Sequence, residues 1–144
     1  MPLVSLLLNV LWVVFGGLWM AVAWFLAALI MAITIIGLPW ARSALTMALY
    51  TLLPFGQTVV DRDHHGTGPL SFLGNVIWLV LAGWWLALGH VLTAAGLAVT
   101  VVGLPFAWAH LKLALLSLWP VGKEVVSAER AGSPERVPRY VGVR

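Results

Sequence analysis

Cysteine is absent from the 144 residues, which excludes disulfides, thiolate metal ligands and a cysteine nucleophile. Charge is also scarce, since 9% of the residues are charged, against about 25% in an ordinary soluble domain. No charged side chain occurs from Pro2 to Ala41, and from Gly66 to Leu111 the only ionisable side chains are two histidines. Each stretch exceeds the roughly 20 residues that cross a hydrocarbon core. A water-soluble fold is therefore excluded, and the lipid bilayer is the first partner that the sequence predicts.

The chemistry of catalysis is missing as well. The apolar segments hold no carboxylate, and the chain shows no nucleophile–base pair, phosphate-binding loop or HExxH helix. We therefore expect no enzyme activity and no cofactor. The one cluster of ligand-type side chains is the run Asp61-Arg62-Asp63-His64-His65. Consecutive residues converge poorly on one ion, so a solvated connector is favoured over a metal or proton sensor, and no metal site is predicted.

Basic residues gather at the C-terminus. Residues 123–144 hold five lysines and arginines against three glutamates, and they include Gly132, Pro134 and Pro138. This composition predicts a partly disordered cytoplasmic tail held near anionic headgroups. No nucleic-acid partner is predicted, because the tail lacks a basic stripe on a folded element and aromatic residues for base stacking.

The chain is a duplication. Shifted by 66 positions, segment 9–60 matches segment 75–126 without a gap, with 23 identities in 52 positions. Asn9-Val10-Leu11-Trp12 falls on Asn75-Val76-Ile77-Trp78, and Thr34–Pro39 falls on Thr100–Pro105. Shared apolar composition does not explain why Asn, Trp, Gly and Pro coincide at one offset. We therefore expect a first membrane repeat, a polar connecting loop, a second membrane repeat and a basic tail, at residues 1–60, 61–68, 69–126 and 127–144.

These motifs resemble the bacterial YccF family of inner-membrane component proteins, over nearly the whole chain. The resemblance lies in Gly-Leu-Pro at 37–39 and 103–105, in Asn75–Trp78 with Gly83-Trp84-Trp85, and in Leu118–Gly122 leading to Val125-Val126-Ser127. It implies a small polytopic protein of the bacterial inner membrane, and it brings with it no activity, cofactor or functional residues. The two copies diverge in polar character where Arg42 and Thr46 of the first correspond to Trp108 and Lys112 of the second.

Glycine and proline divide each repeat into two helices. The apolar runs at about 8–36 and 74–102 contain no proline and predict long helices, and shorter ones are expected at about 39–53 and 105–119. Proline ends a preceding helix and suits the first turn of the next. The predicted breaks are Gly37, Pro39, Pro54, Gly56, Gly103, Pro105, Pro120 and Gly122. The predicted fold class is all-α, a polytopic membrane protein whose two tandem helix–Gly-Leu-Pro–helix repeats form a small helical bundle.

Two arrangements in the membrane remain open. Arg62 in the connecting loop and the basic tail favour the cytoplasm for both segments. Each repeat would then enter and return, giving two parallel-oriented hairpins. The alternative is one crossing per repeat, giving two inverted repeats with surface helices. The short second helices are weakly amphipathic, as in an interfacial, re-entrant or cavity-facing helix.

Few residues are candidates for function. His90 is an ionisable group within the second long apolar run, at the position of Trp24 in the first repeat. Either a hydrogen bond across a helix interface or proton or ion handling would explain it. His110 and Lys112 fit side chains that extend to lipid headgroups. Six tryptophans at helical spacing are expected to face lipid or to pack: Trp12, Trp19, Trp24, Trp78, Trp84 and Trp85.

The residues predicted to contact a pore or lipid headgroups are Arg42, Thr46, His90 and Lys112. One bundle of about four segments is too small to enclose a wide channel. We therefore predict a small bacterial inner-membrane protein that acts as a homo-oligomeric pore or transporter-like component. The alternative is a structural or accessory protein that binds another membrane protein or lipid.

Overall fold

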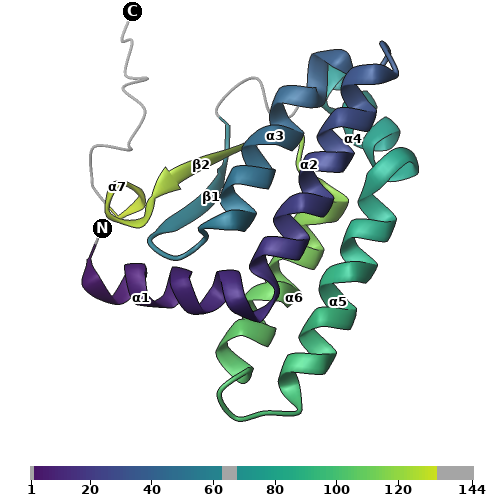
Figure 1. The fold of residues 1–144 in the computed structure, drawn as a ribbon. Helices are drawn as coiled ribbons and strands as arrows, with labels where there is room; N and C mark the ends of the chain where they lie inside the picture. Colours follow the sequence, from purple (N-terminus) through teal and green to yellow (C-terminus); the bar gives the residue numbers. More distant parts are fainter. Residues whose placement is uncertain (1, 63–67, 133–144) are drawn as a thin grey trace, which may run out of the picture.

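The computed structural model describes residues 2–62 and 68–132 and is mostly helical (Figure 1). In the first repeat, α1 (Leu3–Trp12) passes through a kinked turn, Val13–Gly17, into α2 (Leu18–Ile33), and α3 (Leu38–Leu52) returns beside α2. The second repeat has the same order, with α4 (Pro69–Trp78), a π-helical turn at Leu79–Gly83, α5 (Trp84–Ala98) and α6 (Leu104–Leu118). A short helix, α7 (Ala128–Ala131), follows.

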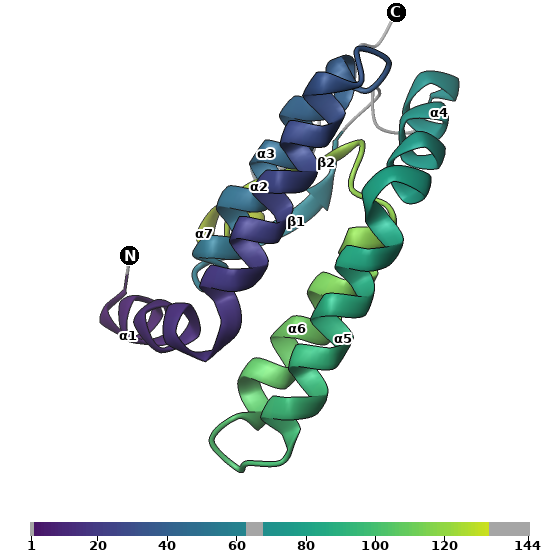
Figure 2. The same ribbon diagram turned by 45° about the vertical axis from the view of Figure 1, so that its right-hand side comes forward.

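Two of the described helical stretches are long and apolar enough to cross a membrane. They are Leu3–Ile33, with a mean hydropathy of 2.3, and Pro69–Ala98, with a mean hydropathy of 1.8. The first is sharply bent, so that α1 points away from α2 (Figure 2). The bend lies at Phe15 and at Gly16, whose φ of 121° is a left-handed conformation that glycine adopts without steric cost. The first predicted long helix is therefore broken by a kink, and the second contains a π-helical turn.

The all-α prediction is wrong in one element. β1 (Gln57–Asp61) and β2 (Lys123–Ser127) form a two-stranded antiparallel sheet, here called the ribbon. Each strand follows a turn at a glycine with positive φ, 90° at Gly56 and 93° at Gly122. A two-stranded ribbon is marginal by itself and depends on packing. Val59 and Val125 supply that packing against the helical core, which a pattern of five residues does not reveal.

The predicted helix breaks lie between the helices or in their first turns. Pro39 and Pro105 stand in the first turns of α3 and α6. Gly37 and Gly103 immediately precede these helices, in tight contact with the end of the previous helix. A Cβ at Gly103 would lie 2.1 Å from the carbonyl oxygen of Leu97, and one at Gly37 would lie 2.7 Å from that of Met31. Glycine is required because the turn brings backbone against backbone.

In each repeat, an Asn and a Trp of the first helix form hydrogen bonds with the backbone at the end of the last helix. The amide of Asn9 donates to Phe55 O and accepts from Phe55 N, both at 3.0 Å. The Trp12 indole donates to Thr51 O at 2.7 Å, in the last turn of α3, where helix carbonyls lack a partner within the helix. The second repeat makes the same bonds, from Asn75 to Val121 and from Trp78 to Ser117 O. The duplicated Asn-x-x-Trp motif therefore satisfies the backbone where each helical hairpin ends.

The tryptophans divide between packing and exposure. Trp12, Trp24 and Trp78 have no exposed surface, and the rings of Trp24 and Trp78 stack with centroids 5.2 Å apart. Trp19 and Trp84 are 77% and 57% exposed. The buried rings belong to the core between the repeats, whereas the exposed ones stand on the outer surface.

Equivalent positions of the two repeats meet each other. Val59 lies opposite Val125 in the ribbon, and the Trp24 indole donates to His90 Nε2 at 3.0 Å. Both pairs are 66 residues apart, so the repeats are related by an approximate two-fold axis that passes from the ribbon to the contact of α2 with α5. The hairpins α2–α3 and α5–α6 accordingly point their tips to opposite ends of the molecule (Figures 1 and 2).

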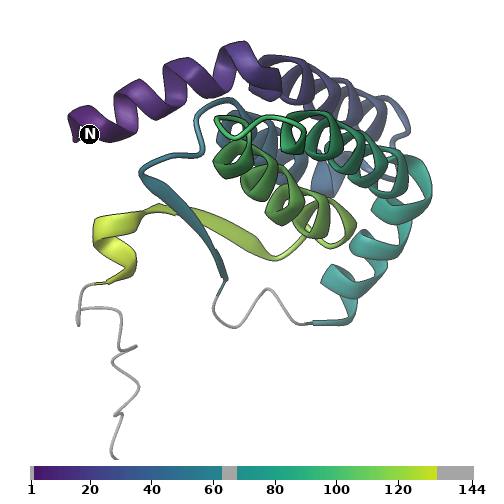
Figure 3. The same ribbon diagram turned by 90° about the horizontal axis from the view of Figure 1, so that it is seen from below.

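The direction of this axis relative to the membrane decides how the hairpins lie in it. Because the hairpins point to opposite ends (Figures 1 and 2), the axis runs across them. An axis along the membrane normal therefore lays the hairpins along the membrane plane, and an axis in the membrane plane makes them cross it as inverted repeats. Viewed along the hairpins, the ribbon lies on one side of the long helices (Figure 3). Tips at opposite ends (Figures 1 and 2) do not fit the predicted pair of parallel-oriented hairpins. Surface chemistry distinguishes the two remaining arrangements, hairpins along the membrane plane and inverted repeats across it.

The surface is apolar at the hairpin tips and charged at the ribbon. Ile35 is 80% exposed at the first tip, and Val99 and Val101 are 86% and 84% exposed at the second. Of the charged residues that the structure describes, only Arg42 and Lys112 lie outside the ribbon, the adjoining Arg62 and α7. The two ends of the molecule are thus apolar, and its polar face surrounds the two-fold axis.

Candidate functional site

Two sites contain residues that the sequence singled out. One is a buried chain of hydrogen bonds between the repeats, and the other is an open groove beside Lys112. Of the predicted connector cluster, the described residues Asp61 and Arg62 contribute to neither. Asp61 pairs with Lys123 across the ribbon, whereas residues 63–65, like tail residues 133–144, lie outside the described part of the chain.

His90 lies at the centre of the buried chain. It has no exposed surface, and it accepts the bond from Trp24 through Nε2. Its Nδ1 lies 2.9 Å from Nδ1 of His110, which is also fully buried. Trp12 stacks on the His110 ring with centroids 4.3 Å apart. The chain thus links α2, α5 and α6 and joins the repeats at their two-fold axis.

The indole fixes the direction of these hydrogen bonds for neutral imidazoles. An indole N–H can only donate, so Nε2 of His90 must accept and its proton must lie on Nδ1. That proton is donated to Nδ1 of His110, whose own proton must then lie on Nε2. This last atom is buried and has no hydrogen-bond partner among the described residues. The chain therefore runs from Trp24 through His90 to His110 and ends on a free donor beside Gly16, where a Cβ would lie 3.3 Å from Nε2.

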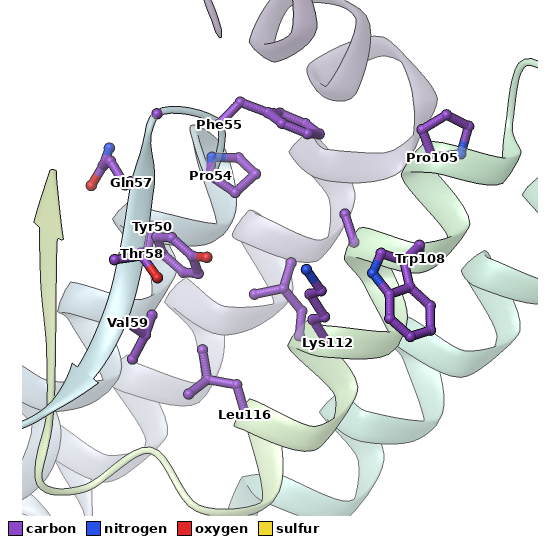
Figure 4. Close-up of a pocket in the computed structure, with 13 residues that line it drawn as sticks. Tyr50, Pro54, Phe55, Gln57, Thr58, Val59, Pro105, Trp108, Lys112 and Leu116 are labelled. Atoms are coloured by element: carbon purple, nitrogen blue, oxygen red, sulfur yellow. The ribbon is translucent and has the colours of Figure 1, made fainter. Parts of the chain in front are cut away.

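The second site is a groove of about 410 Å³ between the ribbon and α6 (Figure 4). Residues from the end of α3 and from β1 form one wall, and α6 forms the other. In Figure 4 the Lys112 side chain extends into the space between Tyr50 and Thr58 on one wall and Trp108 on the other. Its ammonium lies 5.7 Å from the centroid of the Trp108 ring, within reach of a cation–π interaction.

Arg42 and Thr46 lie apart from both sites. Arg42 is exposed and borders a shallow pocket between α2 and α3, beside Phe25 and Leu45. The Thr46 hydroxyl donates to Arg42 O at 2.9 Å, within α3. A single chain therefore does not bring together the four residues predicted to contact a pore or headgroups. His90 is buried, and Lys112 and Arg42 open onto different pockets.

The interpretation of His110 as a headgroup contact is wrong, because its side chain is buried against His90. Hairpin geometry contains the signal that would have found this pair. The turn between α5 and α6 is centred near residue 101, so residues about ten positions either side of it face each other. Sequence reasoning also gave no role to Tyr50 and Thr58, which reach the groove through the ribbon that it did not predict.

Comparison with known proteins identifies the lineage. The family model for YccF, an inner membrane component domain, matches twice, at residues 7–57 and 73–123. The chain is 36% identical over 131 residues to the inner membrane protein YccF of Escherichia coli (strain K12), covering 86% of this chain and 88% of that protein. The Shigella flexneri inner membrane protein YccF matches with the same identity and coverage. No solved structure matches the chain. This protein belongs to the YccF family of inner membrane components.

Proposed function

We propose that this protein is an accessory component of the inner membrane that binds lipid or another membrane protein and catalyses no reaction. Its hairpins lie along the membrane plane within one side of the bilayer, with the two-fold axis along the membrane normal. The ribbon and the tail then face the cytoplasm. The observation that carries the proposal is the separation of apolar tips from a charged ribbon.

Apolar tips favour this orientation over a crossing one. In a crossing arrangement, Ile35 and Val101 would stand at the two aqueous boundaries with most of their surface exposed to water. The ribbon, with Asp61, Lys123 and Glu124, would lie near the depth of the bilayer centre, where charged groups are expensive. An axis along the normal instead leaves the tips in hydrocarbon and the ribbon in water. Arg42 then reaches headgroups by extending its long side chain.

A second candidate function is a homo-oligomeric pore or transporter-like component, multi-pass in the membrane. The buried chain Trp24–His90–His110 favours it, because transporters place polar sites at the interface between repeats, beside interrupted helices. Arg42, Thr46, His90 and Lys112 would approach a path only in an oligomer, because one chain keeps them apart.

One experiment separates the two functions. Native mass spectrometry of the detergent-solubilised protein gives its assembly state, and ion flux is then measured in liposomes prepared from the same sample. The accessory role predicts bound lipid and no flux above that of empty liposomes. A discrete homo-oligomer whose flux changes in Arg42→Ala or Lys112→Ala would establish the pore instead.

A further inference from the structure

We propose that the groove beside Lys112 binds the phosphate headgroup of an anionic phospholipid. The proposal names the ligand of the accessory function and rests on it for the position of the groove at the lipid–water boundary. It does not depend on the buried histidines.

The charge of Lys112 is available to a ligand. Its side chain is exposed, and no carboxylate among the described residues lies within ion-pair distance of it. Lys123, by contrast, is paired with Asp61. An ammonium that is paired with no described carboxylate, and that lies beside the Trp108 ring, remains available to bind an anion through charge-assisted hydrogen bonds.

Polar groups lie on both walls of the groove, near the ribbon. Tyr50, Gln57 and Thr58 contribute them to the wall formed by α3 and β1, beside the apolar Pro54, Phe55 and Val59, and Lys112 faces them from α6 (Figure 4). The α6 wall also contains Trp108 and Pro105, and Pro105 stands in the first turn of α6, next to the apolar tip of the second hairpin. A headgroup between Lys112 and the ribbon would therefore lie at the water boundary while its acyl chains extended along α6, past Trp108 and Pro105.

The surroundings favour a lipid over a free anion. Next to the groove on α6, Trp108 is 62% exposed, Leu104 51% and Leu111 40%. A free phosphate would leave this apolar surface uncovered, whereas acyl chains cover it. Tryptophan and lysine at this depth are also the side chains that settle at headgroup level. The groove volume lies within the range of about 300–1,000 Å³ that is usual for ligand sites.

The duplication explains why the sequence alone did not indicate a groove. The position of Lys112 is Thr46 in the first repeat, so the amine has no equivalent there. The wall opposite Lys112 comes from the first repeat, through Tyr50 and β1. Neither repeat forms the site alone.

The test is native mass spectrometry of the full chain in detergent, titrated with phosphatidylglycerol or with phosphatidylcholine. The parent protein is expected to retain phosphatidylglycerol in preference to phosphatidylcholine. Lys112→Gln should lose one phosphatidylglycerol adduct and bind it about tenfold more weakly, as expected when one charge-assisted contact is removed. Lys123→Gln is the matched control, because it removes the same charge from a paired residue outside the groove, and it should bind like the parent.

A second variant tests the cavity rather than the charge. Ala109→Leu narrows the groove and keeps Lys112, so it should also reduce phosphatidylglycerol binding. Unchanged adducts in Lys112→Gln, or equal losses in Lys112→Gln and Lys123→Gln, would overturn the proposal. Displacement of the lipid by millimolar inorganic phosphate would overturn it as well, because the site would then bind a free anion. Ion flux in liposomes would refute the accessory function but would not change the measured lipid binding. Failure of the accessory function and failure of the lipid site are therefore distinguishable.

Discussion

The most specific arrangement at the residue scale is the direction of the hydrogen bonds from Trp24 to His90 and from His90 to His110. One obligate donor determines the tautomers of two histidines on two different helices. Trp24 of the first repeat and His90 of the second occupy equivalent positions, which meet at the symmetry axis. Because the two residues differ, one donates a hydrogen bond and the other accepts it. Divergence of the two copies made this contact.

Selective ¹⁵N-histidine NMR in detergent micelles tests the direction. We expect a proton on Nδ1 of His90 and on Nε2 of His110, with the signals assigned by His90→Gln and His110→Gln. Trp24→Phe removes the donor and should allow His90 to exchange between tautomers. A proton on Nε2 of His90 in the parent protein would contradict the arrangement.

The two asparagines provide a matched pair of substitutions. Asn9→Ala and Asn75→Ala each leave a backbone N–H and a C=O without their partner at the end of a hairpin. Each orphaned group costs about 1–3 kcal/mol where it is buried, as at Val121, and less at the half-buried Phe55, so both variants should unfold at lower temperature and Asn75→Ala at the lowest. Thermal unfolding in detergent, followed by circular dichroism, measures the loss. Leu7→Ala, at an exposed position of α1, is the control and should change little. If both asparagine variants were as stable as the parent protein, these hydrogen bonds would not stabilise the hairpin ends, and the prediction would be wrong.

The helix boundaries could be predicted from the sequence where proline, glycine and the duplication indicate them. The starts of α3 and α6 and the turns after them were predicted, because Gly37, Pro39, Gly103 and Pro105 act locally on backbone geometry. The ribbon was not predicted, because its stability comes from packing on helices distant in sequence. The bend at Gly16 was missed for a related reason. Glycine permits a left-handed conformation, and only the tertiary contacts of α1 require it.

Two glycines of the second repeat differ in the space around them: Gly103 is tightly packed and Gly96 is not. A Cβ at Gly103 would press on the Leu97 carbonyl, whereas one at Gly96 would meet no atom within 4 Å. Gly103→Ala should therefore lose about 1–3 kcal/mol through displaced backbone. Gly96→Ala lies within α5 and should be neutral or gain up to about 1 kcal/mol, since alanine favours helix. Thermal unfolding of both variants in the same detergent provides the comparison, and equal losses would contradict the assigned turn geometry.

The whole molecule combines an approximately two-fold symmetric fold with a surface that is apolar at the hairpin tips and charged at the ribbon. Sequence reasoning recognised the duplication, the family and the bilayer, because each leaves a pattern in composition or spacing. It did not give the relation between the repeats, because helices 66 residues apart meet through side chains such as Trp24 and His90 whose pairing no local pattern contains. The groove beside Lys112 is hidden for the same reason, since its walls come from different repeats.

The direction of the two-fold axis is the central claim at this scale, and the absence of cysteine makes it directly testable. Single cysteines at Ile35 and Val101 mark the hairpin tips, and one at Thr58 marks the ribbon. Membrane-impermeant maleimide is then applied to intact cells and to inverted membrane vesicles, with detergent-solubilised protein as the control for reactivity. We predict that the ribbon cysteine reacts in inverted vesicles and that both tip cysteines react only after solubilisation. Labelling of the two tips from opposite faces of the membrane would contradict the account and establish inverted, membrane-crossing repeats.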